Sequence, residues 1–199
     1  MNINTKIIFA IISSLVGVVS YFPYIRDVLK RKTQPHTYTW LVWVITQGVA
    51  ATSIWYGQGR WGALGLTIGT FLIFVIFLLS LKFGTKNITR TDTVVLFAAL
   101  GAIVIWWKLK NPLLALFMVT LIDLLGYIPS FRKSYQQPWS ETISSWEGFV
   151  IGNFFAILAL KEYNLLTLSY LIAINIANIV LILICLFRRR LVPKQLPAS

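Results

Sequence analysis

Two carboxyl groups stand inside long apolar stretches of this sequence. Asp123 lies in the middle of the stretch 112–131, and Glu147 lies near the start of the stretch 144–160. A charged group inside a bilayer costs from about 2.5 to more than 10 kcal/mol, so such groups are usually functional. We predict that Asp123 binds a cation, a proton or a substrate amine, and that Asp123 and Glu147 serve proton coupling. The alternatives are an Asp123 that locks helices together and a solvated Glu147 at a helix start.

Amide and phenol side chains accompany these carboxyl groups in the apolar stretches. An amide both donates and accepts hydrogen bonds, which suits a polyhydroxyl or zwitterionic solute. Asn175 and Asn178 are three positions apart and share a helix face, as do Asp123 and Tyr127, four positions apart. The predicted substrate-binding set is Asp123, Asn175, Asn178, Gln47, Asn153, Tyr127 and Tyr21. For each amide the alternative is a hydrogen bond that joins two helices.

The chain contains an internal repeat with an offset of 106 positions. Four identical pairs carry it, with no gap between them: Tyr21 and Tyr127, Pro23 and Pro129, Arg26 and Arg132, Trp40 and Trp146. Matched prolines inside apolar stretches indicate hinges at Pro23 and Pro129, although a shared constraint of the fold would also explain them. The two matched tryptophans are expected to lie at the membrane interface. The repeat divides the chain into 1–91, a linker 92–110, and 111–199.

The composition is that of a membrane protein. Of the 199 residues, 57% are hydrophobic and only 12% are charged, about half the usual share for soluble domains. A bilayer core needs about 20 apolar residues per helix, and backbone groups in lipid must bond internally. Seven apolar stretches meet this need, at about 7–25, 39–56, 61–81, 93–107, 112–131, 144–160 and 164–187. The predicted fold is therefore all-α, with two parallel three-helix bundles joined by one linker helix.

The net charge of +12 is distributed unevenly over the predicted loops. Thirteen of the 18 lysine and arginine side chains fall on one side of a seven-span chain. The positive-inside rule then places the N-terminus outside and the C-terminus in the cytoplasm. The basic clusters are expected to set topology and to contact anionic lipids, not nucleic acid. His36, the single histidine, is expected to be solvated in a basic loop, and Cys185, the single cysteine, to be a small residue of the core or lipid face.

Two short segments resemble the SWEET sugar facilitators and the wider PQ-loop transporters. FPYIRDVLKRKT, at 22–33, resembles the end of their first helix followed by a basic loop, and WYG, at 55–57, resembles the end of their second helix. The resemblance implies a 3+1+3 plan of helices, as in a divergent, bacterial-type member. It also implies that Asn175 or Asn178 matches the sugar-binding asparagine of their seventh helix. The Pro-Gln dipeptide that names the PQ-loop group is absent from this sequence.

These observations predict a membrane transporter of a small polar solute, a sugar or an amino acid, in a bacterial inner membrane. Alternating access between the two bundles would move the solute, with protons coupled through Asp123. The alternative is a receptor or assembly factor that does not transport. One histidine and one cysteine cannot form a metal centre, and no phosphate-binding glycine loop is present, so we expect neither an enzyme nor a cofactor. The sequence does not distinguish a homodimer from a monomer.

Overall fold

The computed structural model describes residues 3–56, 61–85, 87–109, 112–160, 163 and 165–194. Within these ranges the chain forms seven α-helices and one short 3₁₀ helix, with no strand. The elements are α1 (Ile3–Leu29), α2 (Thr37–Tyr56), α3 (Trp61–Phe83), α4 (Arg90–Leu109), α5 (Pro112–Gln136), η1 (Pro138–Ser140), α6 (Ile143–Ala159) and α7 (Leu165–Leu191). The predicted all-α class is confirmed.

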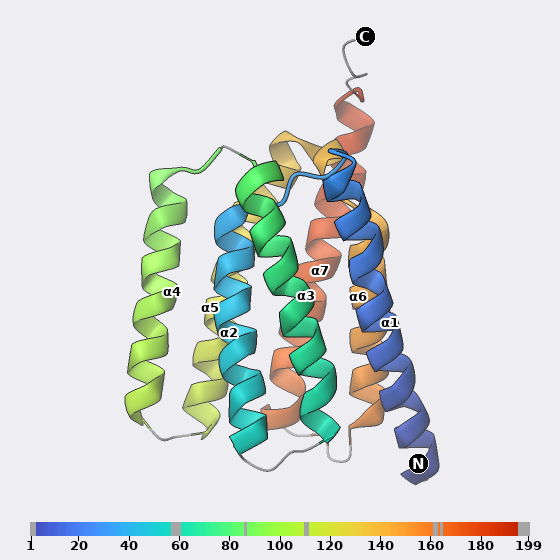
Figure 1. The fold of residues 1–199 in the computed structure, drawn as a ribbon, viewed down its shortest axis with the longest axis vertical. Coiled ribbons are helices and arrows are strands. Elements are labelled where there is room, and N and C mark those ends of the chain that lie inside the picture. The colour runs from blue at the N-terminus through green and yellow to red at the C-terminus, as the bar shows by residue number, and fades with distance from the viewer. Residues whose placement is uncertain are drawn as a thin grey trace.

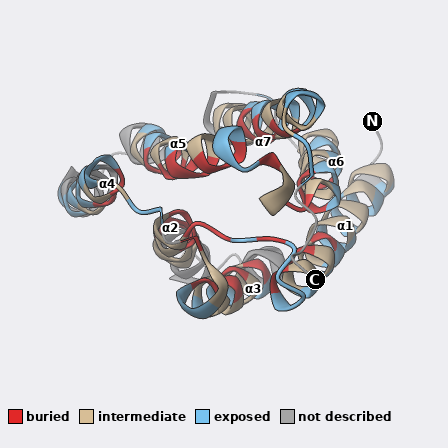
Figure 2. Cartoon of the chain, turned by 90° about the horizontal axis from the view of Figure 1, so that it is seen from above, coloured by how far each residue is buried: buried red, intermediate tan, exposed pale blue. Residues whose placement is uncertain are grey.

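Two of these helices are long and apolar enough to cross a membrane. Among the described residues they are the segments Asn4–Leu29 and Leu168–Leu191, whereas the apolar helical segments Thr67–Phe83 and Ile143–Ala159 are shorter. Many large apolar side chains on the helices are nevertheless exposed, for example Leu15, Phe71 and Phe97. Figure 2 shows that exposed residues lie mainly on the outer faces of the helices, with buried residues turned inwards.

The helices run side by side, and the chain begins and ends at opposite ends of the molecule (Figure 1). In the first part of the chain, α3 packs against both α1 and α2. In the second part, α7 packs in the same way against both α5 and α6. Between these parts, α1 packs extensively against α6, and α2 packs against α5. The helix α4 lies at the edge, against α5 and α2.

Small residues allow α1 and α6 to approach closely. A Cβ atom built on Gly148 of α6 would lie only 1.9 Å from Oγ of Ser20 on α1. One turn further along α6, Gly152 lies against the backbone of Gly17, and its carbonyl accepts a hydrogen bond from Oγ of Ser13 at 2.8 Å. Such contacts let helix backbones pack tightly without large side chains between them. The small residues of α6 are therefore part of its packing against α1.

The matched prolines do not end their helices. Pro23 lies inside α1, which continues to Leu29, and Pro129 lies inside α5, which continues to Gln136. A proline inside a helix removes one backbone hydrogen bond and favours a bend at that point. The hinge at these two positions stays a prediction.

Candidate functional site

A cavity of about 710 Å³ lies between the helices. It extends from Trp40 and Trp146, in the first turns of α2 and α6, to Ile7 near the start of α1. Six helices line it, and no described residue of α4 does. The lining includes six of the seven predicted substrate-binding residues: Tyr21, Gln47, Asp123, Tyr127, Asn153 and Asn178. Most of the polar residues that line this cavity therefore belong to the set predicted from the sequence.

Asp123 is the single acidic or basic side chain among the described residues that line the cavity. It is 2% exposed, and its Oδ2 accepts a hydrogen bond from the hydroxyl of Tyr170 on α7 at 2.7 Å. The Thr46 side chain of α2 lies close enough to interact with the carboxyl group. No described residue donates a hydrogen bond to Oδ1. This buried carboxyl group therefore has one oxygen whose hydrogen-bonding capacity is not satisfied by a described residue.

The remaining polar lining comes from hydroxyl and amide groups on several helices. The hydroxyl of Tyr127 on α5 donates to Oδ1 of Asn178 on α7 at 2.5 Å, and both side chains are buried. On the opposite wall, a Cβ atom added to Gly69 of α3 would lie 4.0 Å from both the Gln47 side-chain oxygen and the Tyr21 hydroxyl. The small residue on α3 therefore leaves room where these two polar groups meet.

Four predicted site residues lie outside the lining of the cavity. Asn175 does not line the cavity, although its Oδ1 is buried without a hydrogen-bond partner among the described residues. Glu147 is exposed and does not line the cavity either, so the structure does not bring it to Asp123. Pro23 and Pro129 lie outside the lining, as expected of positions proposed as hinges.

Aromatic rings close one end of the cavity. Trp43 packs against Tyr127 with ring centroids 4.7 Å apart, against Trp40 at 5.2 Å and against Trp146 at 6.0 Å. Tilted and edge-on contacts of this kind stabilise aromatic pairs. The expectation that Trp40 and Trp146 lie at the membrane interface is wrong, because both are 2% exposed and belong to this central cluster. They are matched in the repeat because they occupy equivalent places in the core.

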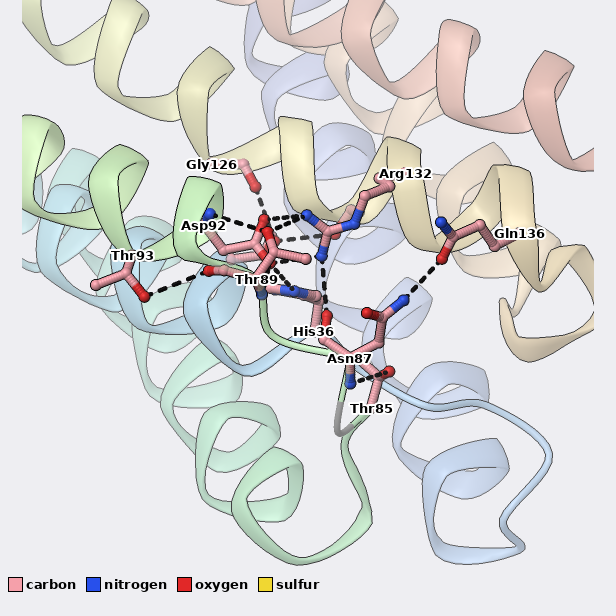
Figure 3. A network of polar contacts seen from close by, with 11 residues as sticks. His36, Thr85, Asn87, Thr89, Asp92, Thr93, Gly126, Arg132 and Gln136 are labelled. Atoms are coloured by element: carbon pink, nitrogen blue, oxygen red, sulfur yellow. Dashed lines mark hydrogen bonds and ion pairs between the residues drawn. The ribbon is translucent and has the colours of Figure 1, made fainter.

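A network of ionic contacts that the sequence did not predict lies beyond the aromatic cluster. Arg132 of α5 donates from both terminal nitrogens to the two oxygens of Asp92 on α4, each at 2.5 Å (Figure 3). It also donates to the Thr89 hydroxyl at 2.8 Å and to the Asn87 carbonyl at 2.9 Å. Burial raises the pKa of Asp92, but the hydrogen bonds from Arg132 and the Thr89 amide outweigh burial and lower it.

His36 belongs to the same network. Its side chain is fully buried, and Nε2 lies 3.4 Å from Oδ2 of Asp92. The prediction that His36 is solvated in a basic loop is therefore wrong. Burial lowers the pKa of His36 from 6.5 to about 4, although the nearby Asp92 carboxylate acts in the opposite direction. At neutral pH this imidazole is uncharged.

A second ionic pair closes the same end of the molecule. Lys133 of α5 and Glu141, which follows η1, are both buried and form a salt bridge. The Lys133 ammonium also donates to the Gln34 carbonyl of the α1–α2 loop at 2.5 Å. Trp146 donates from Nε1 to Oε2 of Glu141 at 2.9 Å, so the ionic pair contacts the aromatic cluster directly. In the α1–α2 loop, the Thr33 hydroxyl is hydrogen-bonded to that of Thr142.

Comparison with known proteins gives this site no precedent. The chain matches no family model, no curated protein and no solved structure. The resemblance to the SWEET and PQ-loop transporters therefore stays a prediction from the two short segments. Within the part of the chain that the structure describes, no group of three or more metal-ligating side chains could hold a metal ion. What the site can do must be argued from its own geometry.

Proposed function

We propose that this protein is a membrane carrier that moves a small polar solute by alternating access. The observation that carries the proposal is the cavity of about 710 Å³, with one partly unsatisfied carboxyl group at Asp123 among amides and phenols. Its size falls within the usual range of about 300–1,000 Å³ for small-molecule sites. The proposed site contains Asp123, Tyr127 and Asn178 on one wall, and Tyr21 and Gln47 on the other.

The packing of the helices supports a 3+1+3 plan for this carrier. The repeat relates α1, α2 and α3 to α5, α6 and α7. Replacing each helix by its counterpart leaves the packed pairs unchanged: α1·α3 becomes α5·α7, α2·α3 becomes α6·α7, and α1·α6 becomes α5·α2. Two bundles in the same orientation, with a solute site at their interface, are a known plan for transporters. The peripheral α4 would then be the linker that restores the orientation of the second bundle.

The outer surface supports a place in a lipid bilayer. Large apolar side chains are exposed along several helices, whereas soluble proteins rarely expose contiguous apolar patches of more than a few hundred Å². The basic residues gather at the end that carries the α1–α2 loop and the C-terminus, which the positive-inside rule assigns to the cytoplasm. We propose the inner membrane of a bacterium as the location, with anionic lipids beside these residues.

The contacts at the cytoplasmic end support a closed gate there. The Lys133–Gln34 and Thr33–Thr142 contacts join the α1–α2 loop to the second bundle. The cavity extends away from this end, towards the start of α1. Alternating access would require these contacts to break while the bundles rock about the α1–α6 and α2–α5 interfaces. The structure then corresponds to a state closed towards the cytoplasm.

Transport measurements in proteoliposomes test the proposal. Sugars, amino acids and small amines are applied to protein adsorbed on a solid-supported membrane at two pH values, and radiolabelled exchange is measured for the same solutes. We expect a solute-specific flux that depends on pH, and we expect Asp123→Asn to lose this pH dependence. No flux of any solute in either assay would overturn the proposal and favour a receptor or assembly factor.

A further inference from the structure

The charge balance of the cavity is unusual. Of the three carboxyl groups that are buried among the described residues, Asp92 pairs with Arg132 and Glu141 pairs with Lys133. Asp123 has no such partner among the described residues, and none of the described residues that line the cavity is a lysine, arginine or histidine. A buried carboxylate without a cation is strongly disfavoured, since the loss of hydration is not compensated. The site is therefore electrostatically complete only with a bound cation or a proton.

The walls of the cavity suit an organic cation better than a metal ion. Aromatic residues supply much of the lining: Tyr21, Trp40, Trp43, Tyr127, Trp146 and Tyr170. The face of an aromatic ring attracts an ammonium group, and Trp does so most strongly. A metal ion such as Na⁺ or Ca²⁺ instead needs several oxygen ligands around a small volume, and in the described lining Asp123 supplies the only carboxylate. A cavity of about 710 Å³ has room for a far larger group.

The negative charge of Asp123, without a cationic side chain in the described lining, disfavours a solute that carries its own carboxylate. Such a group would need a cationic partner, and the polar groups of the described lining other than Asp123 are uncharged amides, hydroxyls, phenols and indoles. A solute with one positive charge and a neutral polar remainder satisfies both features. Its charged head would meet the Asp123 carboxyl group, whose Oδ1 has no hydrogen-bond partner among the described residues, while Gln47 and Asn153 offer hydrogen bonds to the rest.

We propose that the cavity binds a monovalent organic amine or quaternary ammonium ion, with its charged head between Asp123 and the aromatic rings of the cavity. This inference rests on the proposed carrier function and names the substrate class of that site. One carboxylate can be neutralised by the organic cation or by a proton, but not by both, so the two compete. The other titratable groups that line the cavity are the phenols of Tyr21, Tyr127 and Tyr170.

Binding of matched pairs of cation and neutral isostere tests the proposal. Choline is compared with 3,3-dimethyl-1-butanol, and benzylamine with benzyl alcohol, by calorimetric titration into the purified full chain in a neutral maltoside detergent. Each pair has nearly the same shape and differs in one positive charge. We expect at least one cation to bind about tenfold or more tightly than its isostere, because the charge is desolvated beside Asp123.

Three variants assign the effect to Asp123. Asp123→Asn should remove the preference for the cation while leaving the binding of the isostere similar, and Asp123→Glu should retain the preference. Glu147→Gln removes an exposed carboxyl group outside the cavity and should bind choline as the unchanged protein does. Helical circular dichroism and the elution volume on gel filtration show whether each variant is folded.

Several outcomes would overturn the proposal. They are equal binding of both members of each pair, a cation preference that survives Asp123→Asn, and no binding of either cation at millimolar concentration. Flux of a neutral sugar without any cation preference would remove this inference and leave the carrier function intact. Cation binding without flux of any solute would support the cation site and overturn the carrier function.

Discussion

At the scale of single residues, the buried carboxyl groups have two kinds of environment. Asp92 and Glu141 are neutralised by Arg132 and Lys133, whose side chains also bond to loop carbonyls. Breaking such a buried pair typically costs about 3–5 kcal/mol, so these contacts hold loops and helices together. Asp123 instead keeps a hydrogen bond from Tyr170 and an oxygen without a partner. The first kind of carboxylate is structural, and the second is the one that we propose binds a ligand.

Trp43 offers a test of the aromatic contribution to cation binding. It lines the cavity at the centre of the aromatic cluster. We expect Trp43→Leu to weaken choline binding by about 2- to 30-fold, because a cation–π contact contributes about 0.5–2 kcal/mol. Trp43→Phe retains a ring face and should weaken binding less. Calorimetric titration measures both, and Trp139→Leu is the control, since Trp139 does not line the cavity. Binding by Trp43→Leu as tight as that of the unchanged protein would contradict the expectation.

His36 should make the stability of the protein depend on pH. In the unfolded chain its pKa is near 6.5, whereas burial lowers the pKa to about 4 in the folded protein. Between these values the unfolded state binds a proton that the folded state does not. Stability is therefore complete above about pH 6.5 and falls as the pH is lowered towards 4, by up to about 1.4 kcal/mol per pH unit.

The measurement is the thermal unfolding midpoint at several pH values between 4 and 7, for the unchanged protein and for His36→Gln. The charged and titratable groups around His36 are Asp92, Arg132 and Lys133. The lowered pKa of Asp92 places its own titration below this range, so it does not mimic the effect. We expect a flatter pH profile for His36→Gln. Parallel profiles for the two proteins would show that His36 does not cause the dependence.

The sequence was informative about the cavity and uninformative about the ionic network, for a physical reason. A polar group such as Asp123 or Asn178 inside an apolar stretch must face the interior, so its burial can be predicted from its neighbours. A cation beyond the end of a predicted apolar stretch, such as Lys133, has no such constraint in the sequence, because solvent and a buried partner fit the same pattern. Its burial depends on how the loops fold over the helices. One feature of the sequence could have indicated an ionic pair. The chain has only six acidic residues, and one of them, Glu141, lies among basic loops.

At the scale of helices, a glycine lies in close contact at each of the two crossings between the halves of the molecule. Gly148 of α6 meets Ser20 of α1, and at the crossing related by the repeat Gly126 of α5 meets Val42 and Trp43 of α2. The glycine thus lies on α6 at one crossing and on α5 at the other. Each glycine leaves room for a side chain of the facing helix, although the repeat does not match the glycines themselves. Close contact is therefore retained at both interfaces by different residues.

Gly148→Ala tests how close the α1–α6 crossing is. The added Cβ atom would lie 1.9 Å from Oγ and 2.8 Å from Cβ of Ser20, so α1 and α6 must move apart. Overpacking of this kind costs about 1–3 kcal/mol, which corresponds to a lower unfolding midpoint by about 2–4 °C for each kcal/mol in a protein of this length. Differential scanning fluorimetry gives the midpoint.

Gly101→Ala is the matched control for this change. It makes the same substitution inside α4, where nothing lies within 4 Å of the added Cβ atom. Because alanine is a better helix former than glycine by up to about 1 kcal/mol, Gly101→Ala should leave the midpoint unchanged or raise it. If Gly148→Ala unfolds at the same temperature as Gly101→Ala, the crossing is looser than the structure indicates.

At the scale of the whole molecule, the seven helices could be predicted and their ends could not. The apolar stretch 7–25 predicted a first helix that ends before the basic residues, but α1 continues to Leu29. The fifth helix likewise extends past the predicted end at 131 to Gln136. Hydropathy marks where apolar residues stop, whereas arginine and lysine are good helix formers and let the hydrogen-bonded backbone continue. These extra turns carry Arg132 and Lys133 into the closed end.

If the protein is the carrier proposed above, the end that carries the Lys133–Glu141 pair should open during transport, and Cys185 can report on it. This single cysteine of the chain is fully buried in α7, where it interacts with Ser134 and lies near Glu141. Alkylation by N-ethylmaleimide should be slow while the ionic pair holds this end closed. Glu141→Gln leaves the Lys133 ammonium buried without its counter-charge, so the closed state loses free energy relative to a state in which water reaches Lys133. We expect alkylation of Cys185 to become about tenfold faster or more, since 1.4 kcal/mol already corresponds to a factor of ten.

Mass spectrometry measures the rate, well below the unfolding midpoint of each variant, so that global unfolding does not expose the thiol. Glu147→Gln removes an exposed carboxyl group that forms no ion pair among the described residues, and it should alkylate as slowly as the unchanged protein. Cys185→Ser should show no labelling. If Glu141→Gln and Glu147→Gln react at the same rate, the ionic pair does not hold the molecule closed. A static closed end would leave the cavity with one entrance, which is the geometry of a receptor and not of a carrier.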